Sequence, residues 1–418
     1  MYKLLIVVYG GGHVNIIVEL YKELSKKFDV TIIALTSAKF VLNKMKIPHK
    51  DLRYYYEELE NTKDILGIGN RFITKHLIDY SKLGYEDSIL YYGFNVRDYI
   101  FAYGENDLDD LYDKYGRSIF LPLHTMNMII DFEKPDAVLT TNSPRFERAA
   151  LLVSREKNIP NFSIEDLFGQ SRLHSVKEMG LLRNYYGDYI FVMNDMVKDS
   201  ILKKGIQAKE IISSGQPAFQ GILEEKENPS SNDDILTEIG LSIFNDKKIV
   251  LYASQQTEHR KLIFEDLVSC FSQSSNKILV IKPHPNEDVE FMKDAISLLP
   301  YKNILIITNT EIRKLIKIAD VVITQFSTCG LEAILMDKPV IVLKPNFTTY
   351  ELDYAELGLA FELEDIKKIE TLVDLIINNQ NDEFKKVYEN ILKFKMSVNS
   401  SEIISNYIYE KIKERFDE

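Results

Sequence analysis

Short apolar runs, separated by glycine or polar turns and then by amphipathic stretches, constrain this chain most strongly. Such runs occupy residues 4–8, 30–35, 137–140, 161–164 and 189–193, and then 248–252, 277–281, 303–307, 321–324 and 339–343. They are rich in Val, Ile and Leu, which is typical of strands buried on both faces of a parallel sheet. The stretches between them include residues 15–27, 261–271 and 311–318, which have helical periodicity. We therefore predict an α/β fold with two doubly wound, Rossmann-like parallel sheets facing a cleft.

The length of 418 residues suits two domains rather than one core. We place an N-terminal domain at residues 1–214, a C-terminal domain at 215–390, and a helical tail at 391–418 that packs back on the first domain. Residues 52–118 are rich in Tyr, Asp and Glu and have helical rather than strand periodicity. We predict a helical excursion there, whose tyrosines either line an acceptor cleft or pack between amphipathic helices.

The charge and cysteine content exclude several classes of protein. The net charge of −12 argues against nucleic-acid binding, which needs clustered Lys and Arg. The two cysteines, Cys270 and Cys329, form neither a disulfide framework nor a CxxC metal motif. The apolar start is too short for a signal peptide, and no apolar stretch approaches the roughly 20 residues of a membrane span. We therefore expect a cytoplasmic protein, and the sequence leaves open its oligomeric state and a peripheral contact with the inner face of the membrane.

A glycine turn follows the first predicted strand and leads into a helix. Gly11 and Gly12 allow a sharp turn and a close approach of the backbone to a ligand. His13 stands at the start of the helix, where it is a candidate for removing a proton from an acceptor hydroxyl or, alternatively, for capping the helix. The GxGxxG spacing of a dinucleotide site is absent, so we do not expect NAD.

Two loops of the C-terminal half are candidates for binding phosphate. Lys282 and His284 follow a strand in the sequence Lys-Pro-His-Pro, where Pro283 and Pro285 hold the backbone rigid. The second loop lies at the start of a helix, where hydroxyls and backbone N–H groups either bind an anion or form a capping box. Its candidate residues are Ser327, Thr328, Gly330 and Glu332, with the glutamate placed to accept hydrogen bonds from a ribose.

Further polar residues follow other predicted strands. Ser254 and Gln255 are candidates for a phosphate or base contact. Glu165 and Asp166 are an alternative general base, or a pair that orients a histidine, or a solvated turn. The sequence Asp-Leu-Asp-Asp at residues 107–110 lies within the helical excursion, and we predict a solvated helix face there. We predict neither a metal nor another cofactor.

The chain resembles the GT-B glycosyltransferases and the related UDP-N-acetylglucosamine 2-epimerases over most of residues 1–345. The segment Gly-Gly-His-Val-Asn, which contains His13, resembles one in nucleotide-sugar glycosyltransferases, where this histidine is in many cases the base of an inverting transfer. Residues 322–340 resemble the donor-binding segment of these enzymes. The Lys282 and Ser327 loops resemble the His-Pro and Ser/Thr motifs of bacterial sialyltransferases and of polyol-phosphate transferases that use CDP-glycerol. Glu165 and Asp166 loosely resemble the acidic sialyltransferase motif, although the glycine expected next is displaced to Gly169.

This resemblance implies a metal-independent, inverting glycosyltransferase of cell-surface glycan or polysaccharide synthesis. Its partners would be a nucleotide-sugar donor, based on UDP, CMP, CDP or GDP, and a glycan or lipid-linked acceptor. The alternative is a UDP-N-acetylglucosamine 2-epimerase-like enzyme that acts on the nucleotide sugar alone, but the epimerase signature Gly-Thr-Arg-Pro-Glu is absent. A third alternative is a GT-B subunit that binds nucleotide without turnover.

Overall fold

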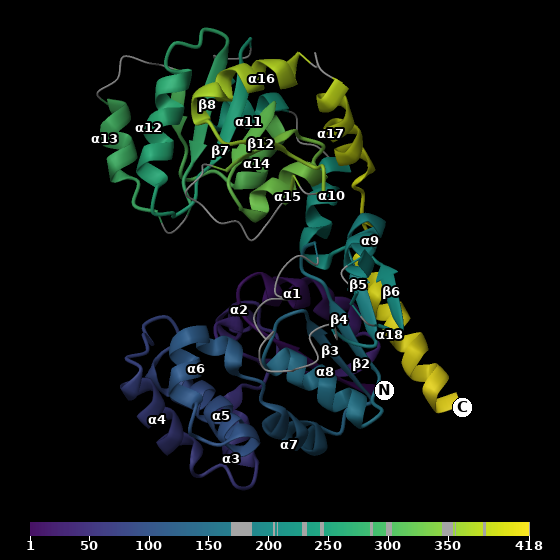
Figure 1. The fold of residues 1–418 in the computed structure, drawn as a ribbon. Helices are drawn as coiled ribbons and strands as arrows, with labels where there is room; N and C mark the ends of the chain where they lie inside the picture. Colours follow the sequence, from purple (N-terminus) through teal and green to yellow (C-terminus); the bar gives the residue numbers. More distant parts are fainter. Residues whose placement is uncertain are drawn as a thin grey trace. The chain divides into compact units, whose positions relative to one another are not determined.

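The computed structural model describes residues 1–168, 186–203, 205–206, 208–227, 232–242, 246–284, 287–297, 303–344, 354–355, 357–378 and 382–417. Within this part of the chain the backbone forms two compact units (Figure 1). The first unit contains Met1–Gln220 and Met396–Glu418, and the second contains Gly221–Lys395. The last helix of the chain therefore belongs to the first unit.

A parallel, six-stranded sheet forms the centre of the first unit, in the order β2-β1-β3-β4-β5-β6. The strands are β1 (Tyr2–Val8), β2 (Phe28–Ala34), β3 (Ala137–Thr141), β4 (Asn161–Ile164), β5 (Tyr189–Val192) and β6 (Glu210–Ser213). The helices around it are α1 (Gly12–Leu24), α2 (Ala38–Lys44), α7 (Leu123–Glu133), α8 (Phe146–Glu156), α9 (Asp195–Lys203), the 3-10 turn η3 (Pro217–Phe219) and α18 (Ser400–Asp417). Buried aliphatic side chains along β1 face a separate core on each side of the sheet.

The chain between β2 and β3 is helical, apart from its connecting turns. It contains α3 (Leu52–Glu58), α4 (Ile65–Lys75), α5 (Tyr85–Tyr103), α6 (Leu108–Tyr115) and the 3-10 turn η1 (Gly116–Ile119). Tyr55, Tyr91, Tyr92 and Tyr99 of this segment are buried within one hydrophobic core. These four tyrosines are packing residues.

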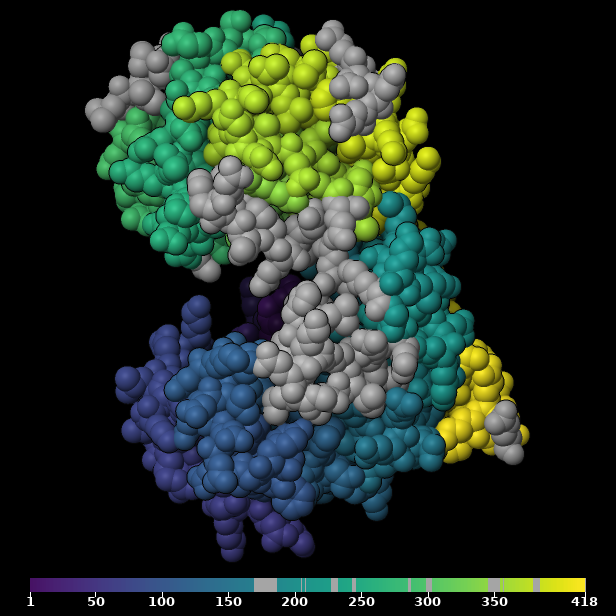
Figure 2. Space-filling model, in the orientation of Figure 1, coloured from purple at the N-terminus to yellow at the C-terminus, as the bar shows by residue number. Residues whose placement is uncertain are grey.

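Helix α18 covers part of the first sheet although it is the last helix of the chain. Its Ile404, Ile408 and Ile412 are buried in the same core as the apolar side chains of α1. The ring of Tyr407 also contacts the ring of Phe191 on β5. In the space-filling view, the yellow side chains of α18 lie against the teal residues of this region (Figure 2).

The second unit has its own six-stranded parallel sheet, in the order β12-β11-β10-β7-β8-β9. The strands are β7 (Lys248–Ala253), β8 (Lys277–Lys282), β9 (Ile304–Ile306), β10 (Val321–Thr324), β11 (Val340–Leu343) and β12 (Phe361–Leu363). Its helices are α11 (Asn232–Glu238), α12 (Arg260–Phe271), α13 (Glu290–Ser297), α14 (Ile312–Ile318), α15 (Thr328–Leu335), the 3-10 turn η5 (Ile366–Lys368), α16 (Ile369–Ile377) and α17 (Asp382–Lys393), and α10 (Gln220–Glu227) begins at the boundary between the units.

The predicted fold class, two doubly wound parallel sheets with helices, is confirmed. The sequence analysis missed β6 and β12, which are edge strands. Each is short and has only two apolar residues, so neither shows the continuous apolar run of a central strand. None of the helices in the described part of the chain is both long and apolar enough to cross a membrane.

Candidate functional site

The order of strands in the first sheet reverses between β1 and β3. In open α/β sheets, ligands bind beyond the carboxyl ends of the strands at such a reversal. Val7 of β1 pairs with Thr140 of β3, so the residues that follow these two strands emerge side by side. His13 follows β1 and Thr141 ends β3, which places both at this edge of the sheet.

The turn after β1 directs His13 to this edge. Gly11 has a φ of 74° and is the N-cap of α1, a backbone conformation that favours glycine. Gly12 is the first residue of α1, and His13 is the second. The side chain of His13 is 12% exposed. The imidazole is therefore largely enclosed, at the N-terminal end of a helix.

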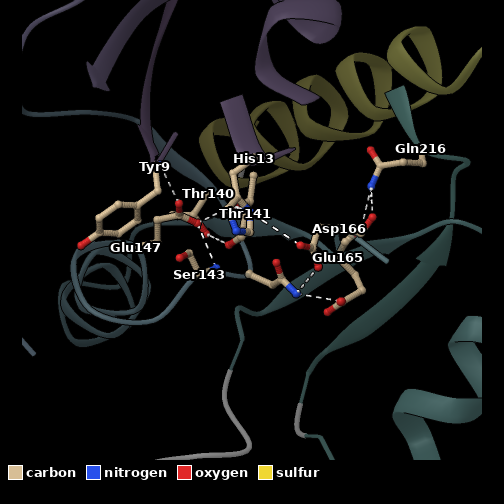
Figure 3. A network of polar contacts seen from close by, with 10 residues as sticks. Tyr9, His13, Thr140, Thr141, Ser143, Glu147, Glu165, Asp166 and Gln216 are labelled. Atoms are coloured by element: carbon tan, nitrogen blue, oxygen red, sulfur yellow. Dashed lines mark hydrogen bonds and ion pairs between the residues drawn. The ribbon is translucent and has the colours of Figure 1, made fainter. Parts of the chain in front are cut away.

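A continuous series of hydrogen bonds runs from His13 into the protein (Figure 3). The Nδ1 atom of His13 lies 2.9 Å from Oγ1 of Thr141. This hydroxyl donates to Oε2 of Glu147 across 2.5 Å. Thr141 and Glu147 are both fully buried. The carboxylate thus acts on the imidazole through one hydroxyl group.

Glu147 is held in place by the backbone on both sides. Its Oε1 accepts from the backbone N–H of Tyr9 at 2.9 Å, and its Oε2 accepts from that of Ser143 at 3.1 Å. It is the second residue of α8, where a carboxylate also interacts favourably with the helix dipole. A buried carboxylate is tolerated when hydrogen bonds satisfy it in this way.

Glu165 and Asp166 follow β4, the neighbour of β3, and reach the same edge. Nδ2 of Asn142 donates to Oε1 of Glu165 at 2.7 Å and to Oδ1 of Asp166 at 2.9 Å. Nε2 of Gln216 donates to the backbone carbonyls of the same two residues, at 2.8 and 3.2 Å. Oδ2 of Asp166 lies 3.9 Å from Nδ1 of His13. Two buried amides therefore hold this acidic pair beside the imidazole (Figure 3).

In the second sheet, the strand order reverses between β7 and β10. Oγ of Ser254, just beyond β7, donates to Oε1 of Glu287 at 2.9 Å. Oε2 of Glu287 accepts from the backbone N–H of His284 at 2.7 Å. Glu287 thus joins the loops after β7 and β8, and His284 itself is exposed. Pro285, the second proline of the predicted rigid turn, lies outside the described residues, as does Gly169 of the first unit.

The loop after β10 is tied to the loop after β7 and leads into α15. Oε1 of Gln255 accepts from the backbone N–H of Phe326 at 2.8 Å. Ser327 is the N-cap of α15, and its Oγ accepts from the backbone N–H of Cys329 at 3.2 Å. Thr328 is the first residue of the helix. The predicted cap is therefore present at the end of the helix where we expect an anion to bind.

Gly330 has a packing role in the first turn of α15. A Cβ atom at this position would lie 3.0 Å from the ring of Tyr354 and 3.2 Å from Cγ2 of Thr324. The hydroxyl of Tyr354 donates to the backbone carbonyl of Ser327 at 2.6 Å. The missing side chain thus allows Tyr354 to support the Ser327 turn.

Burial changes the protonation equilibria of two predicted donor-binding residues. Burial lowers the pKa of Lys282, which ends β8. Burial raises the pKa of Glu332 on α15, and the nearby Arg313 guanidinium opposes this shift at 3.6 Å. Oε2 of Glu332 is buried and has no hydrogen-bond partner among the described residues.

Gln325 is a further polar residue at this edge. Ile323 of β10 pairs with Tyr252 of β7, so Gln325 and Ser254 each lie two residues beyond a paired position. Gln325 is fully buried, and within the described chain neither its Nε2 nor its Oε1 has a hydrogen-bond partner. A buried polar group without a hydrogen-bond partner lowers the stability of a folded protein by about 1–3 kcal/mol.

The structure thus places the predicted residues in two sets. The first-unit set contains His13, Glu165 and Asp166, with the neighbouring Thr141, Asn142, Glu147 and Gln216. The second-unit set contains Ser254, Gln255, Lys282, His284, Ser327, Thr328, Gly330 and Glu332, with the neighbouring Glu287 and Gln325.

Sequence analysis missed Glu147 and Gln216 as members of these sets. Asn142, Glu287 and Gln325 lie in polar segments after predicted strands that the sequence indicates as candidate contacts, but the sequence assigns them no role of their own. Glu147 stands in the first turn of a helix, where glutamate is common for reasons of helix stability alone. Gln216 lies at the predicted boundary between the two domains, where the sequence is typical of a linker. The position of Gln325 directly after a buried strand was the available signal for that residue.

Three further features of the described chain lie outside these two sets: a cavity, the Asp-Leu-Asp-Asp segment and possible metal-binding groups. A cavity of about 670 Å³ in the first unit is lined by Asn158, Asp188 and Lys209, which precede strands, so it lies at the opposite edge of the sheet. Asp109 of the Asp-Leu-Asp-Asp segment pairs with Lys75 and His76. Among the described residues, no group of three or more His, Cys, Asp and Glu side chains is placed to hold a metal ion.

Solved structures of nucleotide-sugar enzymes share this fold along the whole chain. The Staphylococcus aureus MnaA–UDP structure has a TM-score of 0.59 and 16% identity, covering 99% of this chain and 97% of its own. The UDP-GlcNAc 2-epimerase from Neisseria meningitidis, bound to UDP-GlcNAc, has a TM-score of 0.57 and 16% identity, covering 99% and 100%. At this identity the comparison establishes the GT-B-like fold that the sequence resemblance predicted.

Two sequence comparisons point to one family. The teichoic acid glycerol-phosphate primase of Bacillus spizizenii is 24% identical over 250 residues, which are 57% of this chain and 59% of that protein. The match thus spans less than two thirds of that relative. The family model for CDP-glycerol:poly(glycerophosphate) glycerophosphotransferase matches residues 168–412, which is more than half of the chain. These residues include the complete second-unit set and, of the first-unit set, only Gln216. The chain belongs to the CDP-glycerol:poly(glycerophosphate) glycerophosphotransferase family.

Proposed function

We propose that this enzyme transfers a glycerol-phosphate-like group from a cytidine diphosphate-linked donor to an acceptor hydroxyl, in the synthesis of a cell-surface polymer. The observation that carries the proposal is the family match over the second unit, where polar loops after β7, β8 and β10 meet at one edge of the sheet. The sequence resemblance to sugar transferases predicts the same arrangement of donor and acceptor. The family match favours a phosphorylated polyol over a sugar as the transferred group.

The second unit would bind the donor. Lys282 and His284 would donate to the phosphate oxygens, and the N-terminal end of α15 at Ser327 and Thr328 would receive the charge that develops on the leaving phosphate. Glu332 would accept hydrogen bonds from the ribose. These interactions need no metal ion, so we propose that the transfer is metal-independent.

The first unit would bind the acceptor and supply the base. His13 is the base that we propose, and Asp166 is the alternative, because it lies beside the imidazole. The acceptor oxygen would attack the phosphorus of the transferred group. The P–O bond to the nucleotide would break, and CMP would leave with the electron pair while the base took the proton of the hydroxyl.

The released nucleotide tests this proposal. Purified enzyme is incubated with CDP-glycerol and a glycerol phosphate oligomer that ends in a free hydroxyl, and the products are separated by ion-exchange chromatography. We expect CMP together with an oligomer one unit longer, and no CMP when the oligomer is omitted. CMP without elongation, or no reaction with CDP-glycerol, would contradict the proposal.

A UDP-N-acetylglucosamine 2-epimerase activity is the second candidate, because proteins of that description share the fold over the whole chain. It predicts that UDP-N-acetylglucosamine reacts without any acceptor. The same enzyme preparation with this nucleotide sugar alone separates the two activities. A transferase that uses a sugar linked to a nucleoside diphosphate would in turn release the diphosphate, because the bond that breaks is then between the sugar and the phosphate.

A further inference from the structure

The contacts between His13, Thr141 and Glu147 determine which nitrogen of the imidazole carries the proton. The hydroxyl of Thr141 has one hydrogen and contacts two acceptor-capable atoms: Nδ1 of His13 at 2.9 Å and Oε2 of Glu147 at 2.5 Å. The two oxygens of Glu147 already accept backbone N–H groups. The carboxylate therefore acts as an acceptor, and the hydroxyl hydrogen of Thr141 must point to it.

The lone pair of the Thr141 oxygen is then directed at His13, so Nδ1 of the imidazole must be the donor. We propose that Thr141 and Glu147 are positioning residues that hold His13 with its proton on Nδ1, so that Nε2 accepts the proton of the acceptor hydroxyl. This inference rests on the proposed function, because it takes His13 as the base. It adds two residues to the site and favours His13 over Asp166 in that role.

The network also stabilises the charge that the reaction creates. As the acceptor O–H bond breaks, an N–H bond forms at Nε2 and the imidazole becomes an imidazolium. Its Nδ1–H continues to donate to Thr141, and the negative charge of Glu147 lies one hydroxyl away (Figure 3). No proton moves along the network; the imidazolium later releases its Nε2 proton to water. Because Thr141 and Glu147 are fully buried, bulk water does not weaken this interaction.

The tautomer can be observed without any substrate. The chain has seven histidines, so ¹⁵N-histidine labelling gives few signals, and the spectrum of a His13→Gln variant assigns His13. In a long-range ¹H–¹⁵N spectrum of the neutral imidazole, we expect Nδ1 at the frequency of a protonated ring nitrogen and Nε2 at that of an unprotonated one. Protonation of Nε2 in the wild-type protein would overturn the inference.

Thr141→Val removes the hydroxyl and keeps the shape, whereas Thr141→Ser keeps the hydroxyl. We expect Thr141→Val to return His13 to a mixture of tautomers and to lower kcat about tenfold or more, with a much smaller change in KM. Thr141→Ser should restore both the spectrum and most of kcat. A Thr141→Val protein with the wild-type spectrum and kcat would contradict the inference.

Thr125→Val is the matched control. Thr125 is also fully buried, and its hydroxyl donates to the carboxylate of Asp98 at 2.8 Å, in the same unit. We expect a similar loss of stability in this variant, with neither the His13 signals nor kcat changed. The spectrum is recorded without substrate, so a wrong tautomer contradicts only the positioning role. A correct tautomer without transfer from CDP-glycerol contradicts only the proposed function.

Discussion

The two sheets have the same number of strands, but the candidate sites at their edges are built differently: the first is organised around a series of hydrogen bonds, and the second contains an amide with neither of its polar atoms paired. In the first unit, His13, Thr141 and Glu147 form a continuous series of hydrogen bonds. In the second unit, neither amide atom of Gln325 has a partner among the described residues, and one buried oxygen of Glu332 also lacks one. The first-unit amides of Asn142 and Gln216 differ, because each donates through its nitrogen and lacks a partner only at its oxygen. The first arrangement resembles a site prepared for proton transfer, because the orientation of each group is already determined. The second resembles a site whose polar groups are completed by a ligand.

The two sheets also show that the position of a site follows a reversal of strand order and not one particular order. In the first sheet, the third strand in chain order, β3, lies directly beside the first strand, β1. In the second sheet, the third strand, β9, lies at the edge beyond β8, and the fourth strand, β10, lies beside the first strand, β7. In both, the candidate residues follow the two strands on either side of the reversal and a third strand next to them. The comparison can be tested by substitutions that affect one edge and not the other.

The largest effect is expected for His13→Gln, which removes the proposed base. We expect kcat to fall about 10²- to 10⁴-fold, with little change in the affinity for CDP-glycerol, because general base catalysis contributes a factor of this size. The measurement is steady-state CMP release together with calorimetric titration of the donor. His124→Gln, at an exposed position of α7, is the control and should behave like the wild type. Loss of donor affinity in His13→Gln would show that the units do not divide the work as proposed.

His284→Gln should mainly weaken the binding of the donor, whereas His13→Gln mainly lowers kcat. A hydrogen bond to a charged group such as the donor phosphate contributes about 1.5–3 kcal/mol, so we expect the donor to bind roughly 10- to 100-fold more weakly. The same titration measures this loss, and the His13 signals in the ¹⁵N spectrum should remain unchanged. Unaltered donor affinity would remove His284 from the binding site.

Gln216 and Gln325 offer a matched pair, because both are fully buried glutamines, one in each unit. Gln216→Met should destabilise the first unit by about 1–3 kcal/mol, since two backbone carbonyls lose their donor. Gln325→Met should leave the unliganded second unit equally or more stable, since an unpaired amide is removed, and should weaken donor binding.

Urea unfolding measures the stability of each variant through the midpoint of its unfolding transition. Hydrogen exchange identifies the transition in which the substituted unit unfolds. Both variants are compared without donor and with saturating CDP-glycerol. If Gln325→Met is as destabilising as Gln216→Met in the absence of donor, the Gln325 amide is already paired in the free enzyme.

The smallest effect is expected for Glu332→Gln in the absence of donor. Burial raises the pKa of Glu332 in the folded protein, so the folded state holds this proton more tightly than the unfolded state. Stability is therefore lost as pH rises from the ordinary range of a glutamate through the raised pKa. We expect Glu332→Gln to be more stable than the wild type at neutral pH and equally stable below the ordinary range.

Urea unfolding at several pH values measures this difference, with Glu364→Gln, at an exposed carboxyl group of the same unit, as the control. The gain should disappear when CDP-glycerol is bound, because the proposed ribose contact then requires the carboxylate. A pH-independent difference between Glu332→Gln and the wild type would contradict this account.

The sequence by itself determined the fold class and the loops that carry the second-unit set. Buried parallel strands are continuous apolar runs, and the polar residues that end them, such as Lys282 and Ser254, are visible one strand at a time. The same logic identified His13 and the pair Glu165 and Asp166. Short edge strands carried too little apolar pattern to be recognised.

Only the tertiary structure decided which of these residues lie together. Glu147 reaches Thr141 because α8 returns its first turn to the end of β3, and Gln216 reaches Asp166 from 50 positions further along the chain. Neither contact has a sequence pattern, because side-chain hydrogen bonds between distant segments depend on strand order and register. Strand order likewise placed His13 beside Thr141, and with it the hydroxyl that selects the tautomer of the proposed base.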